Sequence, residues 1–169
     1  MSKVAICSSQ RAVRVPRKKI RELIAFVERA EGVGIAEVDL AVVGRREIAE
    51  LNVRYLGHAG ATDVLSFDMS GESGAEGISA QIVVCGEVVA EQARLWGNGV
   101  QREMLLYVVH GLLHLMGYED RSVRGAARMH AREEKLLCEF ERDGARRRRR
   151  GRQGGQGGAA RSNSMGGSG

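Results

Sequence analysis

The chain has 169 residues, which is enough for one domain with a substantial apolar core. Its net charge of +5 is unevenly distributed, because seven of the 26 lysine and arginine residues follow Asp143 and no acidic residue does. Residues 1–143 therefore hold 19 basic side chains against 21 acidic ones, and this near-neutral balance does not by itself identify a nucleic-acid-binding domain.

Apolar runs and cysteines indicate the compartment. The apolar run from Met104 to Met116 is too short for a transmembrane helix, and the one after Lys3 is too short for a secretory signal peptide. The three cysteines are widely spaced, odd in number and without a C-x-x-C motif, which is typical of reduced thiols: Cys7, Cys85 and Cys138. We therefore expect a cytoplasmic protein with no membrane partner.

Apolar periodicity divides the body into short strands and amphipathic helices. Pro16 suits the first turn of a helix, and the apolar residues after it repeat with the spacing of one buried helical face. A segment rich in Gly, Ser and Glu predicts a surface loop. In chain order we expect a strand over 4–8, a helix over 16–32, a strand over 38–43, a helix over 45–55, a strand over 62–67, a loop over 68–79, a strand over 82–85, and helices over 87–96, 101–116 and 122–140.

Four strands and about five helices that do not alternate strictly predict an α+β fold. We expect a single domain over residues 1–143, with one mixed sheet packed by helices. The sequence leaves the order of the strands open.

Residues 144–169 differ in composition from this domain. They begin with a run of five arginines and continue with Gly, Gln and Ser. So few apolar side chains cannot offset the entropy of ordering, which predicts a disordered tail. The tail resembles Arg/Gly-rich RNA-binding segments, and a solvated tail without a specific role is the alternative.

Two histidines, His110 and His114, stand four residues apart in the apolar helix predicted over 101–116. Such positions share one helix face, with Cβ atoms roughly 5–6 Å apart, so both imidazoles can reach one metal ion. Burying two imidazoles is costly unless each has a partner, and a pair of satisfied core histidines is the alternative. Position 111 is Gly, where the H-E-x-x-H motif of metallopeptidases has its general base, and this disfavours peptide hydrolysis.

Two segments of the chain carry a resemblance to a known family. Residues 51–55 read LNVRY and residues 62–67 read TDVLSF, while residues 110–118 read HGLLHLMGY. In this order and at this distance they resemble the two signatures of the YbeY family, bacterial rRNA maturation factors described as zinc-dependent endoribonucleases. The resemblance covers about residues 4 to 140.

The resemblance implies one zinc ion per chain at the end of the central helix, with three protein ligands and a position left for water. His110 and His114 match two of the family's three histidine ligands. At the third position this chain has Asp120, with Glu119 where the family has Asp. A carboxylate oxygen binds zinc at a similar distance, so we expect a His-His-Asp site that accepts other divalent ions more readily. A turn residue without a metal is the alternative for Asp120.

The resemblance also implies an arginine near the site, because phosphodiester cleavage needs a cation at the developing negative charge. The family's arginine follows the tyrosine of the first signature, where this chain has Leu56. Arg54, two residues earlier, is the candidate catalytic residue here. His58 and His130 are weaker candidates for metal ligands, because one lies in a loop and the other on the charged side of the last helix.

The function implied by the resemblance is a zinc-dependent endoribonuclease specific for single-stranded RNA. It would act in 16S rRNA 3′-end maturation and late-stage ribosome quality control, with the 16S rRNA precursor and the small ribosomal subunit as partners. Leu56 in place of the arginine leaves a second class open, a non-catalytic ribosome-assembly factor with a structural metal. The oligomeric state is not predicted.

Overall fold

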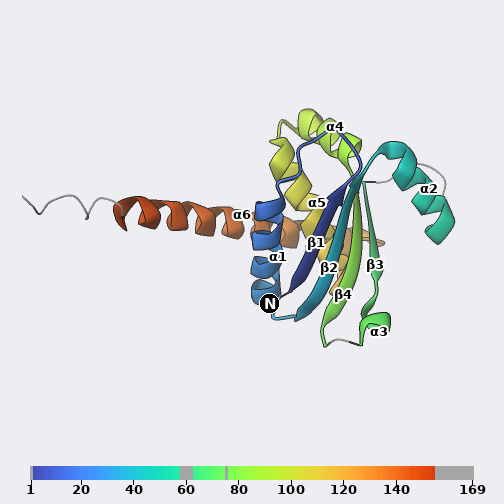
Figure 1. Cartoon of the computed structure of the whole chain (residues 1–169), viewed down its shortest axis with the longest axis horizontal. Helices are drawn as coiled ribbons and strands as arrows, with labels where there is room; N and C mark the ends of the chain where they lie inside the picture. Colours follow the sequence, from blue (N-terminus) through green and yellow to red (C-terminus); the bar gives the residue numbers. More distant parts are fainter. Residues whose placement is uncertain (1, 58–62, 75, 155–169) are drawn as a thin grey trace, which may run out of the picture.

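The computed structural model describes residues 2–57, 63–74 and 76–154 (Figure 1). Its centre is one sheet with the strand order β1-β2-β4-β3. Strands β1 (Lys3–Ser8), β2 (Ile35–Val43) and β4 (Ile78–Cys85) are parallel, and β3 (Val64–Asp68) pairs with β4 in the antiparallel direction. The predicted mixed sheet of four strands is confirmed, and β2 and β4 each begin earlier than their β-branched runs indicated.

The five predicted helices are present. They are α1 (Arg17–Glu31), α2 (Arg45–Leu56), α4 (Gly86–Trp96), α5 (Val100–Leu115) and α6 (Val123–Gly154). An additional single turn, α3 (Ser70–Ser73), lies in the segment that we expected to be a loop, where the backbone N–H of Ser70 donates to Asp68 Oδ1 at 2.9 Å. Within the described residues, no helix has both the length and the apolar composition that crossing a membrane requires.

Two apolar clusters lie on opposite faces of the sheet. The larger cluster fills the space between the sheet and helices α1, α5 and α6, and most of α5 is buried within it. The smaller cluster lies under α2 and uses alternate residues of the same strands, which point to the other face: Val43, Ile48, Leu65, Val83 and Cys85. The central position of α5 follows from its apolar composition, because a helix that is apolar nearly all round is buried.

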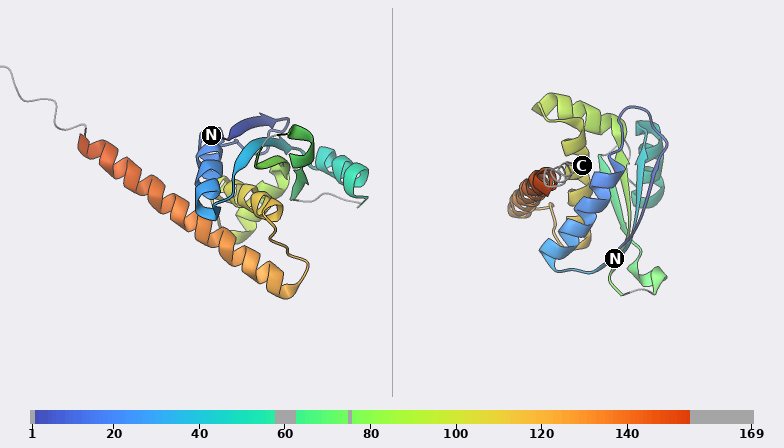
Figure 2. Two further views of the ribbon diagram at one scale, coloured as in Figure 1. Left: turned by 90° about the horizontal axis from the view of Figure 1, so that it is seen from below. Right: turned by 60° about the vertical axis from the view of Figure 1, so that its left-hand side comes forward.

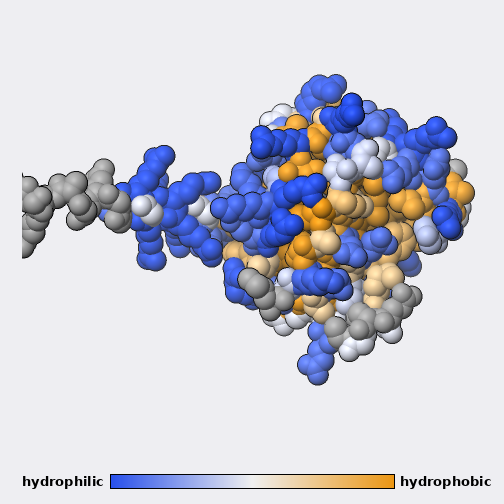
Figure 3. All heavy atoms as spheres, viewed as in Figure 1, coloured by the Kyte–Doolittle hydropathy of each residue, from blue (hydrophilic) through white to orange (hydrophobic). Residues whose placement is uncertain are grey.

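Helix α6 is much longer than expected. Figures 1 and 2 show it crossing the body and then projecting beyond it. Its first half packs into the core, and its end, drawn as hydrophilic in Figure 3, contains the arginine run. The structure has helix over residues 144–154, where the sequence analysis expected a disordered tail. Arginine is a good helix former, and no proline interrupts the run. An ion pair at 2.9 Å between Asp143 and Arg147 adds local support. Residues 155–169 lie outside the described part.

Candidate metal centre

Helix α5 brings His110 and His114 together near its C-terminal end. The two Nε2 atoms are 3.0 Å apart, and the ring planes are nearly perpendicular, at 85°. The helix packs against β3 and β4 on one side and against α6 on another, so its last turns cannot tilt freely. Both side chains are half-buried and line one hollow in the surface, as expected for two residues on the same helix face.

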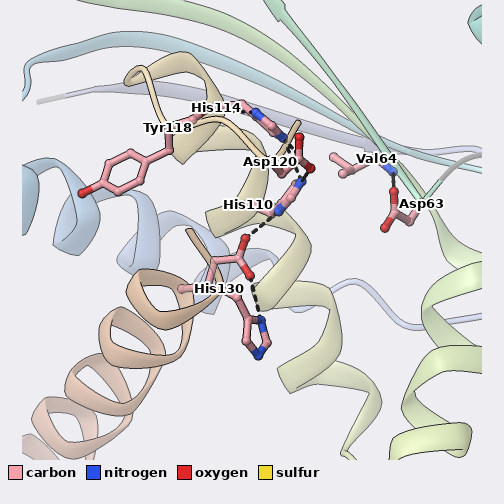
Figure 4. A network of polar contacts seen from close by, with 8 residues as sticks. Asp63, Val64, His110, His114, Tyr118, Asp120 and His130 are labelled. Carbon is pink, nitrogen blue, oxygen red and sulfur yellow. Dashed lines mark hydrogen bonds and ion pairs between the residues drawn. The ribbon is translucent and has the colours of Figure 1, made fainter. Parts of the chain in front are cut away.

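Gly117 turns the chain back toward these histidines. Its φ of 95° lies in the region that favours glycine, and the backbone N–H of Tyr118 donates to Leu113 O at 3.0 Å. The returning segment places Asp120 Oδ2 at 3.8 Å from His110 Nε2 and 3.5 Å from His114 Nε2. Figure 4 shows the three side chains converging from the helix and the loop that follows it.

The convergence defines a group, which we call the His-His-Asp group, formed by His110, His114 and Asp120. Among the described residues, it is the one set of His, Cys, Asp and Glu side chains whose ligand atoms all lie within 4.8 Å of one another. Glu119 is not part of it. The position of His58 lies outside the described residues, and the exposed His130 does not belong to the group.

Hydrogen bonds fix which nitrogen of each ring faces the group. The Nδ1 of His110 lies 2.5 Å from Glu133 Oε1, and the Nδ1 of His114 lies 3.2 Å from the carbonyl oxygen of Tyr118. A carboxylate and a carbonyl can only accept, so both Nδ1 atoms carry the hydrogen and donate it. Each neutral ring therefore presents a bare Nε2 lone pair to the other. Two lone pairs at 3.0 Å repel unless a proton or a metal ion lies between them.

This arrangement fits a zinc ion. In a tetrahedral site, two Zn–N bonds of about 2.0–2.1 Å put the nitrogens roughly 3.3 Å apart, close to the observed separation. Neutral imidazole nitrogens and a carboxylate oxygen are ordinary zinc ligands, and hydrogen bonds from the far side of each ring to a carboxylate or carbonyl are typical of metal-bound histidines. The identity of the metal does not follow from this donor set alone.

Glu133 on α6 contacts this group, and the sequence analysis did not single it out. Its side chain is only 7% exposed, and its other oxygen lies 3.6 Å from Nδ1 of His130. Burial alone would lower the pKa of His110, but the hydrogen bond and charge of Glu133, with the charges of Asp63 and Asp120, raise this pKa above its usual value. A signal was present in the sequence, because Glu133 falls on the apolar side of its helix between Met129 and Leu136.

A second set of polar contacts anchors the turn that carries Asp120. The hydroxyl of Tyr118 donates to Glu31 Oε2 at 3.2 Å, and Arg132 on α6 pairs with Glu31 Oε1 at 2.5 Å. The guanidinium of Arg128 lies 5.5 Å from the centroid of the Tyr118 ring. The turn is therefore tied to both α1 and α6, which holds the loop close to the end of α5.

The His-His-Asp group opens into a hollow of about 670 Å³. Besides the two histidines, it is lined by Leu56, by Asp63 and residues of β3, and by the loop over residues 117–121. Arg121 is the cation that lines this hollow in the described part of the chain, and Asp63, Glu119 and Asp120 are its acidic residues. Arg54 does not line it; its guanidinium lies 5.5 Å from the ring centroid of Tyr55 instead.

Gly111 stands between the two histidines where α5 meets the sheet. A Cβ atom there would lie 2.9 Å from Ser66 Oγ and 3.1 Å from Ile82 Cγ2. A side chain at this position would therefore force Ser66 or Ile82 to shift, so the packing favours the glycine that the sequence argument took as evidence against a metallopeptidase.

Comparisons with known proteins find one family whose members resemble this chain. The model of a family described as "Endoribonuclease YbeY" matches residues 5–141. A protein named endoribonuclease YbeY from Salinibacter ruber is 37% identical over 125 residues, covering 70% of this chain and 79% of that relative. One of the same name from Renibacterium salmoninarum is 32% identical over 141 residues, covering 79% of this chain and 90% of the relative.

A solved structure has a similar fold. The solution structure of a protein from Thermotoga maritima superimposes with a TM-score of 0.57 at 27% sequence identity. The match covers 85% of this chain and 93% of that protein. The similarity in sequence and in fold therefore extends over most of the body that carries the His-His-Asp group.

Proposed function

This chain belongs to the YbeY family, and from that membership we propose that it is a zinc-dependent endoribonuclease that cuts single-stranded RNA. We further propose that it acts in the cytoplasm in 16S rRNA 3′-end maturation and late-stage ribosome quality control, with the small ribosomal subunit as its partner. The observation that carries the proposal is the His-His-Asp group, which faces an open hollow.

His110, His114 and Asp120 would hold the metal in this proposal. A zinc ion bound there would supply an acidified water and a positive charge for the phosphoryl oxygens. Glu133 accepts the Nδ1–H of His110, so that the Nε2 lone pair points into the group. The carbonyl of Tyr118 does the same for His114. In the hydrolysis, the oxygen of a water forms a bond to phosphorus and the water gives up a proton. The bond to the leaving ribose oxygen breaks, and that oxygen takes up a proton.

The open side of the group supports catalysis over a purely structural metal. Structural zinc sites are closed by four protein ligands, whereas catalytic sites keep a position for water. Here three side chains approach from α5 and the following loop, and the remaining side faces the hollow. We also propose that Arg54, on the exposed surface of α2, contacts RNA outside the hollow.

One observation favours a second candidate, a non-catalytic ribosome-assembly factor that keeps the metal for structure. Leu56 lines the hollow at the position where the family has an arginine, so this side chain offers no positive charge to a phosphate. The two candidates differ in whether RNA is cut when metal is bound.

Metal analysis combined with an RNA cleavage assay separates them. We expect about one zinc per chain in the purified protein, cleavage of a labelled single-stranded RNA, loss of cleavage with a chelator and recovery with zinc. A duplex of the same sequence should stay intact. The variant in which His110 and His114 are both alanine controls for contaminating nuclease. Zinc-loaded protein that leaves single-stranded RNA uncut would favour the assembly factor instead.

A further inference from the structure

We propose that Arg121 supplies the positive charge that contacts the RNA phosphate at the metal centre. The inference rests on the proposed function, because it takes RNA as the ligand of the hollow. Arg121 directly follows Asp120, so their Cα atoms are about 3.8 Å apart. Its side chain lines the same hollow as His110 and His114.

The charges in the hollow make such a cation necessary. Among the described residues that line it, Asp63, Glu119 and Asp120 are acidic and Arg121 carries the one guanidinium. A divalent metal ion would bring this set to neutrality, and the loss of Arg121 would leave it negative again. Each RNA phosphate carries a negative charge, and nearby charges of the same sign repel it strongly in a partly buried site. Binding of the phosphate therefore depends on Arg121.

Arg121 is also available for a ligand. It is exposed and makes no hydrogen bond, ion pair or ring contact with another described residue. Two neighbouring arginines are engaged, since Arg128 lies over Tyr118 and Arg132 pairs with Glu31. A guanidinium can donate two parallel hydrogen bonds to the oxygens of one phosphate, which an ammonium cannot match in geometry.

A second position in the hollow offers a further test. Leu56 lines the same hollow as Arg121 and is 49% exposed. An arginine placed there can reach into the same space without displacing core side chains. Arg124 provides the matched control, because it is also exposed but lines a separate hollow with Arg128.

The experiment compares Arg121→Ala, Arg121→Lys, Arg124→Ala and the double variant Arg121→Ala with Leu56→Arg. Zinc content and thermal unfolding are measured first, and we expect both to match the wild type in all four. For Arg121→Ala, kcat should fall by about 100-fold or more, as for the loss of one donor to a developing oxyanion. The lysine variant should retain part of the rate, and Leu56→Arg should restore at least part of what Arg121→Ala loses.

Binding provides a readout that does not depend on cleavage. The affinity for a single-stranded RNA is measured on the zinc-loaded proteins across salt concentrations, with a 2′-O-methyl RNA and phosphorothioate linkages to resist cutting. Arg121→Ala should reduce the slope of log affinity against log salt by about 0.7, the value for one phosphate contact on a single strand. Arg124→Ala should not change it.

The outcomes separate the two proposals. If the wild type cuts no RNA, the endoribonuclease proposal fails, and the salt slope alone decides the role of Arg121. If Arg121→Ala matches Arg124→Ala in both kcat and salt slope, the inference about Arg121 is overturned while the endoribonuclease proposal stands. A loss in Arg54→Ala with none in Arg121→Ala would assign the required charge to Arg54.

Discussion

The His-His-Asp group has two sides that are built differently. On its helix side, His110 and His114 lie on a buried helix, and each ring is held by a hydrogen bond to its Nδ1. On its loop side, the Asp120 side chain is 46% exposed and lies 3.5 Å or more from both Nε2 atoms. The fold alone thus positions the two imidazoles, whereas the carboxylate of Asp120 would have to move slightly to bind the same ion. The two sides therefore differ in how much of their geometry is set without a metal.

The largest effect should follow from breaking the helix side. We predict that His114→Ala loses the bound zinc and lowers the thermal unfolding temperature, because metal binding free energy is partly folding free energy. Metal analysis and thermal unfolding with and without a chelator measure both. His130→Ala is the matched control, since His130 is an exposed histidine outside the group and should leave zinc content unchanged. Full zinc occupancy in His114→Ala would rule out the proposed site.

The next effect tests the loop side. Asp120→Ala should lose most of the zinc affinity but keep the fold, since the side chain is exposed and contributes no core packing. Asp120→His should keep zinc bound and narrow the choice of metal, because imidazole suits zinc and a carboxylate accepts harder ions. Glu119→Ala should change affinity much less. Titrations with zinc and manganese compare the three, and a loss confined to Glu119→Ala would show that the wrong acid has been assigned.

A smaller effect should come from Glu133, which acts on the helix side through His110. Glu133→Gln keeps the size of the side chain and an acceptor oxygen but removes the charge. We expect zinc affinity to fall by about 10-fold, at the low end for the loss of such a supporting group.

The pH dependence distinguishes this role from simple packing. Glu133 raises the pKa of His110, so in the wild type a proton competes with the metal up to a higher pH than at an ordinary histidine. In zinc-free protein the same shift stabilises the fold below the usual histidine pKa, and this stabilisation is lost as pH rises through the raised pKa. Zinc titrations across pH should therefore show the fall in affinity at a lower pH in Glu133→Gln. An unchanged pH profile would show that Glu133 contributes packing alone and does not act through the pKa of His110.

The smallest effect on either side of the site should follow from removing residues 144–169. Zinc content and stability should stay the same, because the arginines of this segment are exposed and the Asp143–Arg147 pair lies on the surface. RNA affinity should fall similarly for all sequences, and its salt dependence should flatten, because fewer counterions are released. Filter binding at several salt concentrations tests this, and an unchanged salt slope would mean that the segment does not contact RNA.

The helix side and the loop side of the His-His-Asp group also differ in how far the sequence predicts them. The spacing of His110 and His114 is a local property of one helix, so the sequence alone indicates that they share a face. Asp120 depends on how the chain turns at Gly117, and it was identified through the family resemblance rather than by periodicity. The contact between His110 and Glu133 joins residues on two helices, and no local pattern specifies it. The burial of a glutamate on an apolar helix face was the available signal.

The same division holds for the fold. Apolar periodicity predicted the number of strands and the five longer helices, because these patterns are local. The strand order and the pairing of β3 with β4 depend on contacts between distant segments and did not follow from the sequence. The arginine run differs from its prediction for another reason. The expected disorder rested on the lack of apolar residues, whereas the helix in the structure agrees with the helix propensity of arginine and with the Asp143–Arg147 ion pair.

The tight contact of Gly111 with the sheet limits how this site can change in evolution. A glutamate between the two histidines would create the peptidase motif H-E-x-x-H, and in sequence it is a single replacement away. Its Cβ atom would press on the side chains of Ser66 and Ile82, which would have to shift to make room for it. Smaller residues on those two strands would relieve the contact, and each would remove packing under the helix that carries the His-His-Asp group. The packing of the sheet thus opposes a change between two hydrolase chemistries that differ by one residue in the helix.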